Sequence, residues 1–318
     1  MKNFKLILTI LIFYFHILIA ASSDPVFGEN GMIVSTSKQA SEAGIEILKK
    51  GGNAVDAAVA VGFALAVTSS SNGNIGGGGF MVAAMTDRET FTLDYREKAP
   101  AAAHRDLFLN DSGNVVPGMS LFSRAGSGVP GTVDGLIRAL ADHGSGNITL
   151  RQALAPAIRL AEKGFELSHY EARRFNGYEG LFQSNDAAAA IFIRKNNNPW
   201  KKGDKLVQKD LAKTLKRISK YGRDGFYSGP VADLIVAEMK RGNGLISLED
   251  LKNYSSVYRD PVSGTYNGHE VISMGPPSSG GALLVNMMNM LENYPVDSLG
   301  WNSSDYIHLL TEVERRAY

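Results

Sequence analysis

Residues 54–67 constrain the fold more than any other part of this sequence, because they are apolar almost without interruption. Asp56 is the one charged residue in the run, and alanine and glycine recur at close spacing. Asn53 precedes the run and can accept a hydrogen bond from the free N–H groups at the start of a helix. A helix that is apolar on every side needs other elements around its whole circumference. The run therefore predicts a buried helix inside a layered domain.

Other segments carry the start and stop signals of helices. Ser37 can cap a helix that ends before Gly51-Gly52, and Thr149 with Gln152 forms the capping-box pattern of another that ends at Lys163. Further helices are expected at 208–221, at 231–241 and after Ser303 or Ser304, and strands at 80–85, 90–94 and 270–274. Residues 185–200 have the weakest pattern and include an expected solvent loop at 196–198. The mixture predicts an α+β fold without internal repeats.

The charge balance and the residue counts exclude several classes of protein. The 318 residues carry 33 basic and 32 acidic side chains, which leaves no basic face of the kind that nucleic-acid-binding proteins use. The chain has no cysteine, so disulfides, thiolate metal sites, iron–sulfur clusters and a cysteine nucleophile are excluded. Its six histidines show no metal-ligand spacing. We expect no metal, no cofactor and no nucleic-acid partner.

The N-terminus has the three-part pattern of a secretory signal peptide. Two lysines within residues 1–5 are followed by an apolar run over residues 6–19 and then by small residues at 20–23. The apolar run is shorter than the roughly 20 residues that a membrane-spanning helix needs. We expect residues 1–22 to be a signal peptide and the protein to be periplasmic or extracellular. An uncleaved signal that anchors the protein to the membrane is the alternative.

Two glycine-rich stretches suggest nucleotide binding only superficially. Residues 76–79 are four glycines followed by a strand-like run, without the Lys-Ser/Thr pair of a phosphate-binding loop. We interpret them as backbone that needs unusual dihedral angles or the close approach of other groups. Residues 126–131 match the G-x-G-x-x-G pattern, but no strand is evident before them and no acidic residue lies near position 150. A turn before a helix is the better interpretation, and a dinucleotide-binding oxidoreductase is the weaker alternative.

A charged segment at the end of a predicted strand is the best candidate for a binding site. Residues 94–98 read Asp-Tyr-Arg-Glu-Lys. An arginine at such a position can bind a carboxylate with two parallel hydrogen bonds. Asp94 and Glu97 could orient the guanidinium of Arg96. The same pattern also fits a solvated charge cluster at a turn, so the residues alone leave both interpretations open.

The C-terminal pattern ends without a stop signal. Apolar residues recur at helical spacing up to the last residue, Tyr318, and Glu312 and Arg316 form an i,i+4 pair. No glycine, proline or polar tail follows, so the sequence looks truncated. An apolar run upstream holds three methionines that are expected to pack in a core: Met287, Met288 and Met290.

Seven motifs, in their order and spacing, resemble the large subunit of the γ-glutamyltranspeptidases, also called glutathione hydrolases. They are GGNAVDAAVA at 51–60, GNIGGGGF at 73–80, DYREKAP at 94–100, GVPGTV at 128–133, APAI with LAE within 155–162, GFYSG at 225–229 and PPSSGG at 276–281. Each motif is modest alone, but the series is specific. The resemblance covers residues 31–318.

The resemblance implies an N-terminal nucleophile hydrolase with an αββα four-layer sandwich, incomplete in this chain. Residues 23–318 would be the large-subunit part of a precursor that cuts itself into large and small subunits, which then form a heterodimer. A threonine at the new N-terminus, beyond Tyr318, would be the nucleophile, with its own α-amine as base. It would cleave the γ-glutamyl amide of glutathione and other γ-glutamyl compounds, and water or an acceptor amino acid or dipeptide would take the γ-glutamyl group.

The resemblance also assigns two binding residues. Arg96 would bind the α-carboxylate of the γ-glutamyl group, and Glu97 is a weaker candidate for holding Arg96 in place. Residues 35–39 and 67–72 depart from the family pattern, which affects loops and not the arginine. No Thr-Thr-His-type motif occurs, so no catalytic residue is expected within this chain.

Two further alternatives stay open. A related acylase that acts on cephalosporin side chains or on poly-γ-glutamate would share most of the motifs. A genuine truncated partner subunit without catalytic activity is the non-enzymatic alternative. The fragment alone is expected to be inactive in either case.

Overall fold

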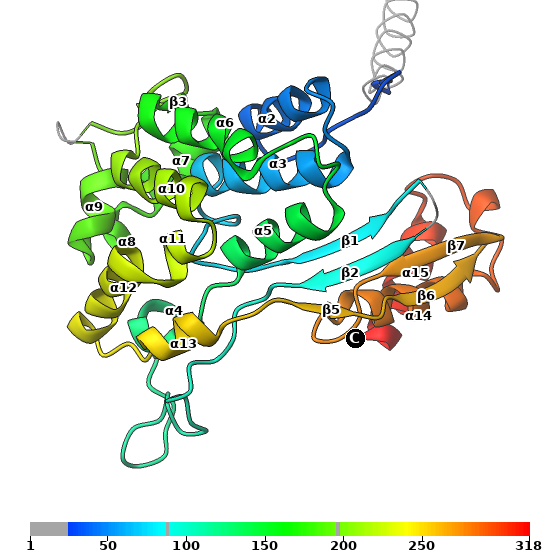
Figure 1. The fold of residues 1–318 in the computed structure, drawn as a ribbon. Coiled ribbons are helices and arrows are strands. Elements are labelled where there is room, and N and C mark those ends of the chain that lie inside the picture. Colours follow the sequence, from blue (N-terminus) through cyan, green and yellow to red (C-terminus); the bar gives the residue numbers. More distant parts are fainter. Residues whose placement is uncertain (1–24, 87–88, 195–197) are drawn as a thin grey trace, which may run out of the picture. The chain divides into compact units, whose positions relative to one another are not determined.

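The buried helix expected from residues 54–67 is α3 (Ala54–Thr68), and it lies among other helices (Figure 1). Its Val59 and Phe63 side chains are completely buried. It packs against α2 (Lys38–Lys49), α5 (Thr132–His143) and α6 (Leu150–Lys163). Glycine and alanine permit this close approach, because a Cβ at Gly62 would lie 2.9 Å from Leu136. The prediction of an enclosed helix is confirmed.

The predicted caps form at the starts of these helices. Asn53 Oδ1 accepts the N–H of Asp56 at 3.0 Å, and Asp56 Oδ2 accepts the N–H of Asn53 at 2.8 Å. Thr149 and Gln152 make the same reciprocal pair at α6. Ser37 accepts the N–H of Ala40 at 3.4 Å, which confirms the start of α2. Each cap satisfies N–H groups that have no partner inside the helix.

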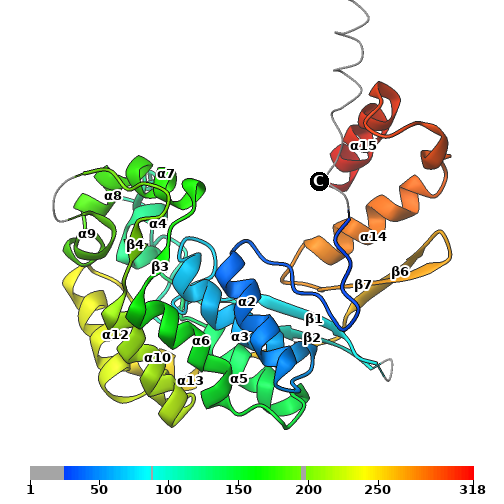
Figure 2. The same ribbon diagram turned by 90° about the horizontal axis from the view of Figure 1, so that it is seen from above.

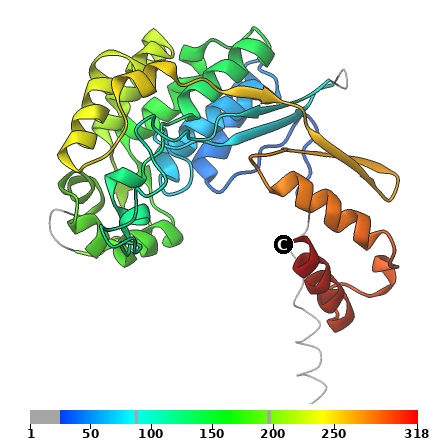
Figure 3. The ribbon, with the colours of Figure 1, turned by 90° about the horizontal axis from the view of Figure 1, so that it is seen from below.

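A three-stranded antiparallel sheet lies against this helical layer. Its order is β1 (Phe80–Ala84), β2 (Thr90–Asp94) and β5 (Val257–Arg259). Phe91 and Leu93 of β2 are buried in the same core as α3. Figure 2 looks onto the helices, whereas Figure 3 shows the sheet in front with the helices behind it. Val82, in β1, is 41% exposed.

Further helices and one pair of short strands complete the helical region. They are α4 (Met119–Phe122), α7 (His169–Gly177), α8 (Glu179–Gln183), α9 (Asp186–Phe192), α10 (Lys209–Tyr221), α11 (Asp224–Tyr227), α12 (Gly229–Arg241) and α13 (Leu248–Asn253), with the pair β3 (Phe165–Glu166) and β4 (Lys205–Leu206) and the 3₁₀ turn η1 (Arg124–Gly126). The helices expected at 208–221 and 231–241 are confirmed as α10 and α12, the latter starting two residues earlier. The weak pattern at 185–200 missed α9, which is capped by Asn185. Of the expected loop at 196–198, only residue 198 is described.

The C-terminal part contains a hairpin and two helices. Strands β6 (Val262–Tyr266) and β7 (His269–Ser273) pair antiparallel, and they are followed by α14 (Gly280–Leu291), the 3₁₀ turn η2 (Val296–Ser298) and α15 (Ser304–Ala317). Helix α14 packs on β6, β7 and α15. The expectation of core packing for Met287, Met288 and Met290 is wrong, because all three are only half-buried. Gly281 is the one buried residue of α14.

The computed structural model describes residues 25–86, 89–194 and 198–318. Residues 34–318 form one compact unit. Residues 25–33 belong to a separate N-terminal unit and contain no helix or strand. The predicted signal peptide, residues 1–22, lies outside the described residues. Within those ranges, no helix combines the length and the apolar character that a membrane span requires.

Candidate functional site

Arg96 lies on the turn that follows β2, and side chains hold its main chain from both sides. Its N–H donates to Asp94 Oδ1 at 2.9 Å. Its carbonyl accepts a hydrogen bond from the Tyr254 hydroxyl at 2.8 Å. Both backbone polar groups of Arg96 are therefore satisfied without the help of its own side chain.

Asp94 plays a different part from the one expected from the sequence. One carboxylate oxygen holds the Arg96 backbone, and the other accepts Arg259 Nε at 2.8 Å. The Asp94 side chain is only 9% exposed, and Arg259 belongs to the neighbouring strand β5. The ion pair is a diagonal contact between the two strands, because Arg259 lies opposite Thr92 in the register. Asp94 binds the backbone of Arg96 rather than its guanidinium.

The side chains of Arg96 and Glu97 are both exposed. Among the described residues, neither side chain makes a hydrogen bond or an ion pair. Glu97 lies beside the glycine loop, because a Cβ at Gly77 would be 3.3 Å from its Oε1. The guanidinium of Arg96 is therefore free to bind an anion, and its backbone does not have to move to do so.

Glycines surround the turn at three positions where a side chain would not fit. A Cβ at Gly78 would lie 2.5 Å from the Tyr95 carbonyl oxygen and 2.8 Å from the Arg96 Cα. A Cβ at Gly131 would lie 2.0 Å from the same carbonyl oxygen, and one at Gly135 would lie 2.2 Å from the Tyr95 ring. This confirms the interpretation of the glycine cluster as backbone that other groups approach closely. Burial raises the pKa of Tyr95 to about 12.

Backbone hydrogen bonds join the glycine loop to the start of α5. The N–H groups of Gly131 and Thr132 both donate to the Gly77 carbonyl, at 2.8 and 3.1 Å. Thr132 Oγ1 donates to the Asn74 carbonyl at 3.1 Å. Gly131 is the N-cap of α5, and the 3₁₀ turn η1 precedes this segment where the dinucleotide pattern requires a strand. Residues 126–131 do lead into a helix, as predicted, but they are not a turn: Gly126 ends η1, and the segment that follows is extended and bridges Lys98 through Val129.

Tyr254 and Arg259 belong to the site and were missed by sequence reasoning. They reach the turn from segments 158 and 165 residues away from their partners. Neither Tyr254 nor Arg259 lies within a local sequence motif. The only available signal is their place within a charged and aromatic stretch before a predicted strand.

Two other features of the molecule are weaker candidates for a site. A cavity of about 740 Å³ lies between the start of α2, the residues that follow α3, and α7 to α9, and neither Arg96 nor Glu97 lines it. In the parts of the chain that the structure describes, no group of three or more histidine or acidic side chains could hold a metal ion. The turn at Arg96 is thus the best-supported candidate. A planar guanidinium on a fixed turn can bind a carboxylate and set its orientation.

Comparisons with known proteins show what the chain as a whole is similar to. Residues 40–318 match the family model described as gamma-glutamyltranspeptidase. A glutathione hydrolase proenzyme of Pseudomonas sp. (strain A14) is 48% identical over 94% of this chain and 52% of its own length. An acylase ACY 1 proenzyme of Pseudomonas sp. (strain SE83) is 35% identical over 92% of this chain and 53% of its own length.

The fold has a close match among solved structures. The crystal structure of Helicobacter pylori gamma-glutamyltranspeptidase superimposes with a TM-score of 0.89 at 43% identity, covering 93% of this chain and 84% of that chain. The predicted α+β fold of the N-terminal nucleophile hydrolase type is confirmed. The described residues form the three-stranded sheet β1-β2-β5 and the two-stranded sheets β3-β4 and β6-β7. The chain spans about half the length of the curated relatives it matches.

Proposed function

The chain belongs to the gamma-glutamyltranspeptidase family, and we propose that the whole protein is a γ-glutamyltransferase and glutathione hydrolase. The observation that carries the proposal is the exposed guanidinium of Arg96 on a turn whose backbone is held by Asp94 and Tyr254. In this proposal Arg96 binds the α-carboxylate of the γ-glutamyl donor. Glu97 is the weaker candidate, and its proposed role is to hold Arg96 in place.

The reaction proposed for the whole protein has two steps. A threonine hydroxyl oxygen attacks the γ-carbonyl carbon, the C–N bond breaks, and the hydroxyl proton passes through the threonine α-amine to the departing amine. The resulting γ-glutamyl ester is then attacked by water or by the amine of an acceptor amino acid or dipeptide. The threonine of this proposal belongs to a second segment, outside the 318 residues. In the proposal, this chain contributes the Arg96 turn, which binds the donor carboxylate.

A small subunit from the same precursor is the proposed partner. The coverage of about half of each curated relative supports a second segment of similar size. Apolar side chains on the C-terminal part give the same indication, since Ile307 is 52% and Trp301 is 87% exposed. Exposed apolar surface of this kind is typical of interfaces.

The proposal is tested by offering the whole protein three donors that differ in the α-amino and α-carboxylate groups. Glutathione carries both, a glutaryl amide keeps the carboxylate but lacks the amino group, and a butyryl amide lacks both. We expect release of cysteinylglycine from glutathione and little cleavage of the butyryl amide, because glutathione gives Arg96 a carboxylate and the butyryl amide does not. Preferential cleavage of the glutaryl amide would overturn the assignment in favour of an acylase, which the similarity to an acylase proenzyme keeps as the second candidate.

Export of the protein is a separate proposal that rests on residues 1–22. Cell fractionation and the N-terminal mass of the purified protein test it. Recovery of a chain that starts near residue 23 outside the cytoplasm is the expected result. An intact N-terminus in a membrane fraction would indicate an uncleaved anchor instead.

A further inference from the structure

The carbonyl of Arg96 is held by a residue far along the chain, and that residue has little freedom to move. Tyr254 is 3% exposed, and its hydroxyl lies 2.8 Å from the Arg96 carbonyl oxygen. A Cβ at Gly131 would lie 2.1 Å from this hydroxyl, so the space around it is filled. Burial raises the pKa of Tyr254 well above its usual value, so the hydroxyl keeps the proton that it donates.

The ring of Tyr254 is fixed by two neighbours. It stacks on the Tyr227 ring with centroids 5.8 Å apart and planes 5° apart. Lys98 Nζ lies 5.1 Å from the centre of the Tyr254 ring and donates to the Ser255 carbonyl at 2.7 Å. Tyr227 is itself anchored, since its hydroxyl donates to the Pro130 carbonyl at 2.8 Å. The ring is therefore held both by its face contacts and by the segment next to it.

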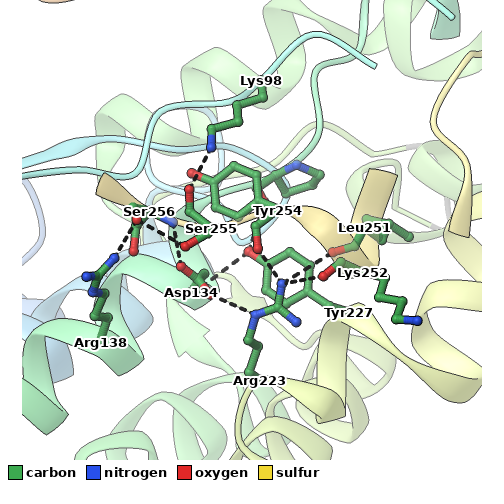
Figure 4. A network of polar contacts seen from close by, with 11 residues as sticks. Lys98, Asp134, Arg138, Arg223, Tyr227, Leu251, Lys252, Tyr254, Ser255 and Ser256 are labelled. Atoms are coloured by element: carbon green, nitrogen blue, oxygen red, sulfur yellow. Dashed lines mark hydrogen bonds and ion pairs between the residues drawn. The ribbon is translucent and has the colours of Figure 1, made fainter. Parts of the chain in front are cut away.

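The backbone of Tyr254 is fixed by the ion pair between the buried Asp134 and the half-buried Arg223 (Figure 4). Arg223 Nε donates to Asp134 Oδ1 at 2.8 Å, and its Nη2 donates to the carbonyls of Lys252, at 3.0 Å, and Tyr254. The other oxygen of Asp134 accepts the N–H of Ser256 at 2.7 Å. Asp134 lies in the first turn of α5, so the same helix whose N-cap packs against the Arg96 turn also fixes the far side of Tyr254.

We propose that Tyr254 is a positioning residue for Arg96, and that the Asp134–Arg223 pair holds Tyr254 in the place where it does this. The inference rests on the proposed role of Arg96 in binding the donor carboxylate. Tyr254 does not have to contact the substrate. Its hydroxyl fixes the carbonyl side of the turn, as Asp94 fixes the N–H side, and the two contacts together set the direction in which the Arg96 side chain leaves the backbone.

The physical effect of losing the hydroxyl is specific. The Arg96 carbonyl would lose its one described partner, and the turn would be held by Asp94 alone. A guanidinium that samples several positions binds a carboxylate less tightly, because part of the binding energy is spent on ordering it. A donor without an α-carboxylate makes no use of the guanidinium and should not be affected.

The test is Tyr254→Phe in the whole enzyme, assayed with L-γ-glutamyl-p-nitroanilide and with 4-aminobutyryl-p-nitroanilide, which lacks the α-carboxylate. We expect kcat/KM for the first donor to fall about five- to tenfold, mainly through KM, which corresponds to the loss of one neutral hydrogen bond. The second donor should be cleaved as by the unmodified enzyme. Tyr258→Phe is the matched control, because it removes a hydroxyl that donates to Asp142 at 2.9 Å and does not contact the turn.

The outcomes separate this inference from the function on which it rests. Arg96→Lys is measured with the same two donors. If Arg96→Lys changes the ratio of the two kcat/KM values and Tyr254→Phe does not, the positioning role is overturned and the role of Arg96 stands. If Arg96→Lys leaves the ratio unchanged, the role of Arg96 fails and the inference fails with it.

A second variant keeps the test decisive if Tyr254→Phe does not fold. Arg223→Lys keeps a positive charge beside Asp134 but removes the planar group that reaches the carbonyls of Lys252 and Tyr254. A positioning role predicts the same selective loss with the carboxylate donor. An equal loss with both donors, or no loss with either, would contradict it.

Discussion

Arg96 combines a fixed backbone with a side chain that has no partner in the described residues. Its N–H and carbonyl are both bound by other side chains, at 2.9 and 2.8 Å. A charged side chain of this kind gains more from a bound anion than one already paired within the protein, because no existing bond has to be broken. The proposed donor preference of the whole protein can therefore be tested by substitutions at this one residue.

Arg96→Ala in the whole enzyme should raise KM for glutathione by about ten- to a hundredfold, the range that corresponds to the loss of charged hydrogen bonds. Self-cleavage of the precursor should continue, because the turn keeps its backbone contacts with Asp94 and Tyr254. Initial rates give KM, and the subunit bands on a denaturing gel report processing. An unchanged KM would show that Arg96 does not bind the donor.

Gly135→Ala should destabilise the chain by about 1–3 kcal/mol, as overpacking in a filled core usually does. The added Cβ would lie 2.2 Å from the Tyr95 ring, which packs against the core and cannot move away without displacing the turn. Thermal unfolding measures the effect. Gly180→Ala in α8 is the control, because no atom lies within 4 Å of its added Cβ, and it should leave stability unchanged or slightly raised.

At the scale of elements, the local signals found most of the longer helices and the strands of the first hairpin. Ser37, Asn53 and Thr149 each cap a helix within three residues of themselves, so the sequence contains the whole interaction. Helix α9 was missed because its seven residues are too few to show a period. Strand β5 has three residues and forms by pairing with β2, a partner far away in sequence.

The residues of the candidate site also fall into those that a local signal predicts and those that depend on long-range contacts. Arg96 was found because it lies in a local motif, and the residues that hold it were not, because their contacts with the turn span about 160 residues. Tyr254 and Arg259 acquire their roles only when β5 joins the sheet. Asp94 was expected to orient the guanidinium, but its buried carboxylate is already occupied by a backbone N–H and by Arg259.

Glu46 joins two helices in a way that depends on pH. Partial burial alone would raise the pKa of Glu46, but hydrogen bonds from Lys50 and Arg159 outweigh it and hold the pKa below its usual value of 4.5. Lys50 lies on the same helix, whereas Arg159 belongs to α6. Because the folded-state pKa is lowered, the stabilisation is present above the unfolded pKa and is lost as the pH falls through the folded value.

Glu46→Gln should therefore lower the free energy of unfolding at pH 7 by less than about 1 kcal/mol, as is usual for half-exposed ion pairs. The difference from the unmodified chain should shrink as the pH falls below 4.5. Denaturant unfolding at a series of pH values gives both results. Glu42→Gln is the control, because its pair with Lys38 is long, at 3.8 Å, and exposed. A difference that persists at acid pH would contradict the role of Glu46.

At the scale of the whole molecule, the C-terminal part keeps much of its apolar surface in contact with water. Helix α14 buries only Gly281, and Tyr294, Trp301 and Ile307 are 53%, 87% and 52% exposed. Elsewhere the chain has an extensive core around α3. The contrast is expected if a second segment covers the C-terminal part in the complete protein.

The 318 residues expressed alone should therefore bind a hydrophobic dye and self-associate, and coexpression with the proposed small subunit should suppress both. Light scattering and dye fluorescence are the measurements. The double change Trp301→Lys with Ile307→Lys should reduce self-association of the isolated chain. A chain that is monomeric and does not bind the dye would favour the alternative of a complete, non-catalytic partner subunit.

The ion pair between Asp94 and Arg259 has a consequence for the order of events during synthesis on the ribosome. The two residues are 165 positions apart, so β2 is complete long before its neighbour β5 exists. At about 5–20 residues per second, the edge of β2 waits roughly 10–30 seconds for its partner. During that interval both outer edges of the β1–β2 hairpin are unpaired, and other nascent chains can join the edge of β2 that β5 later covers. The yield of this protein in a cell should thus depend on translation speed between the two strands, and the Arg96 turn is completed only when the last of these 165 residues has emerged.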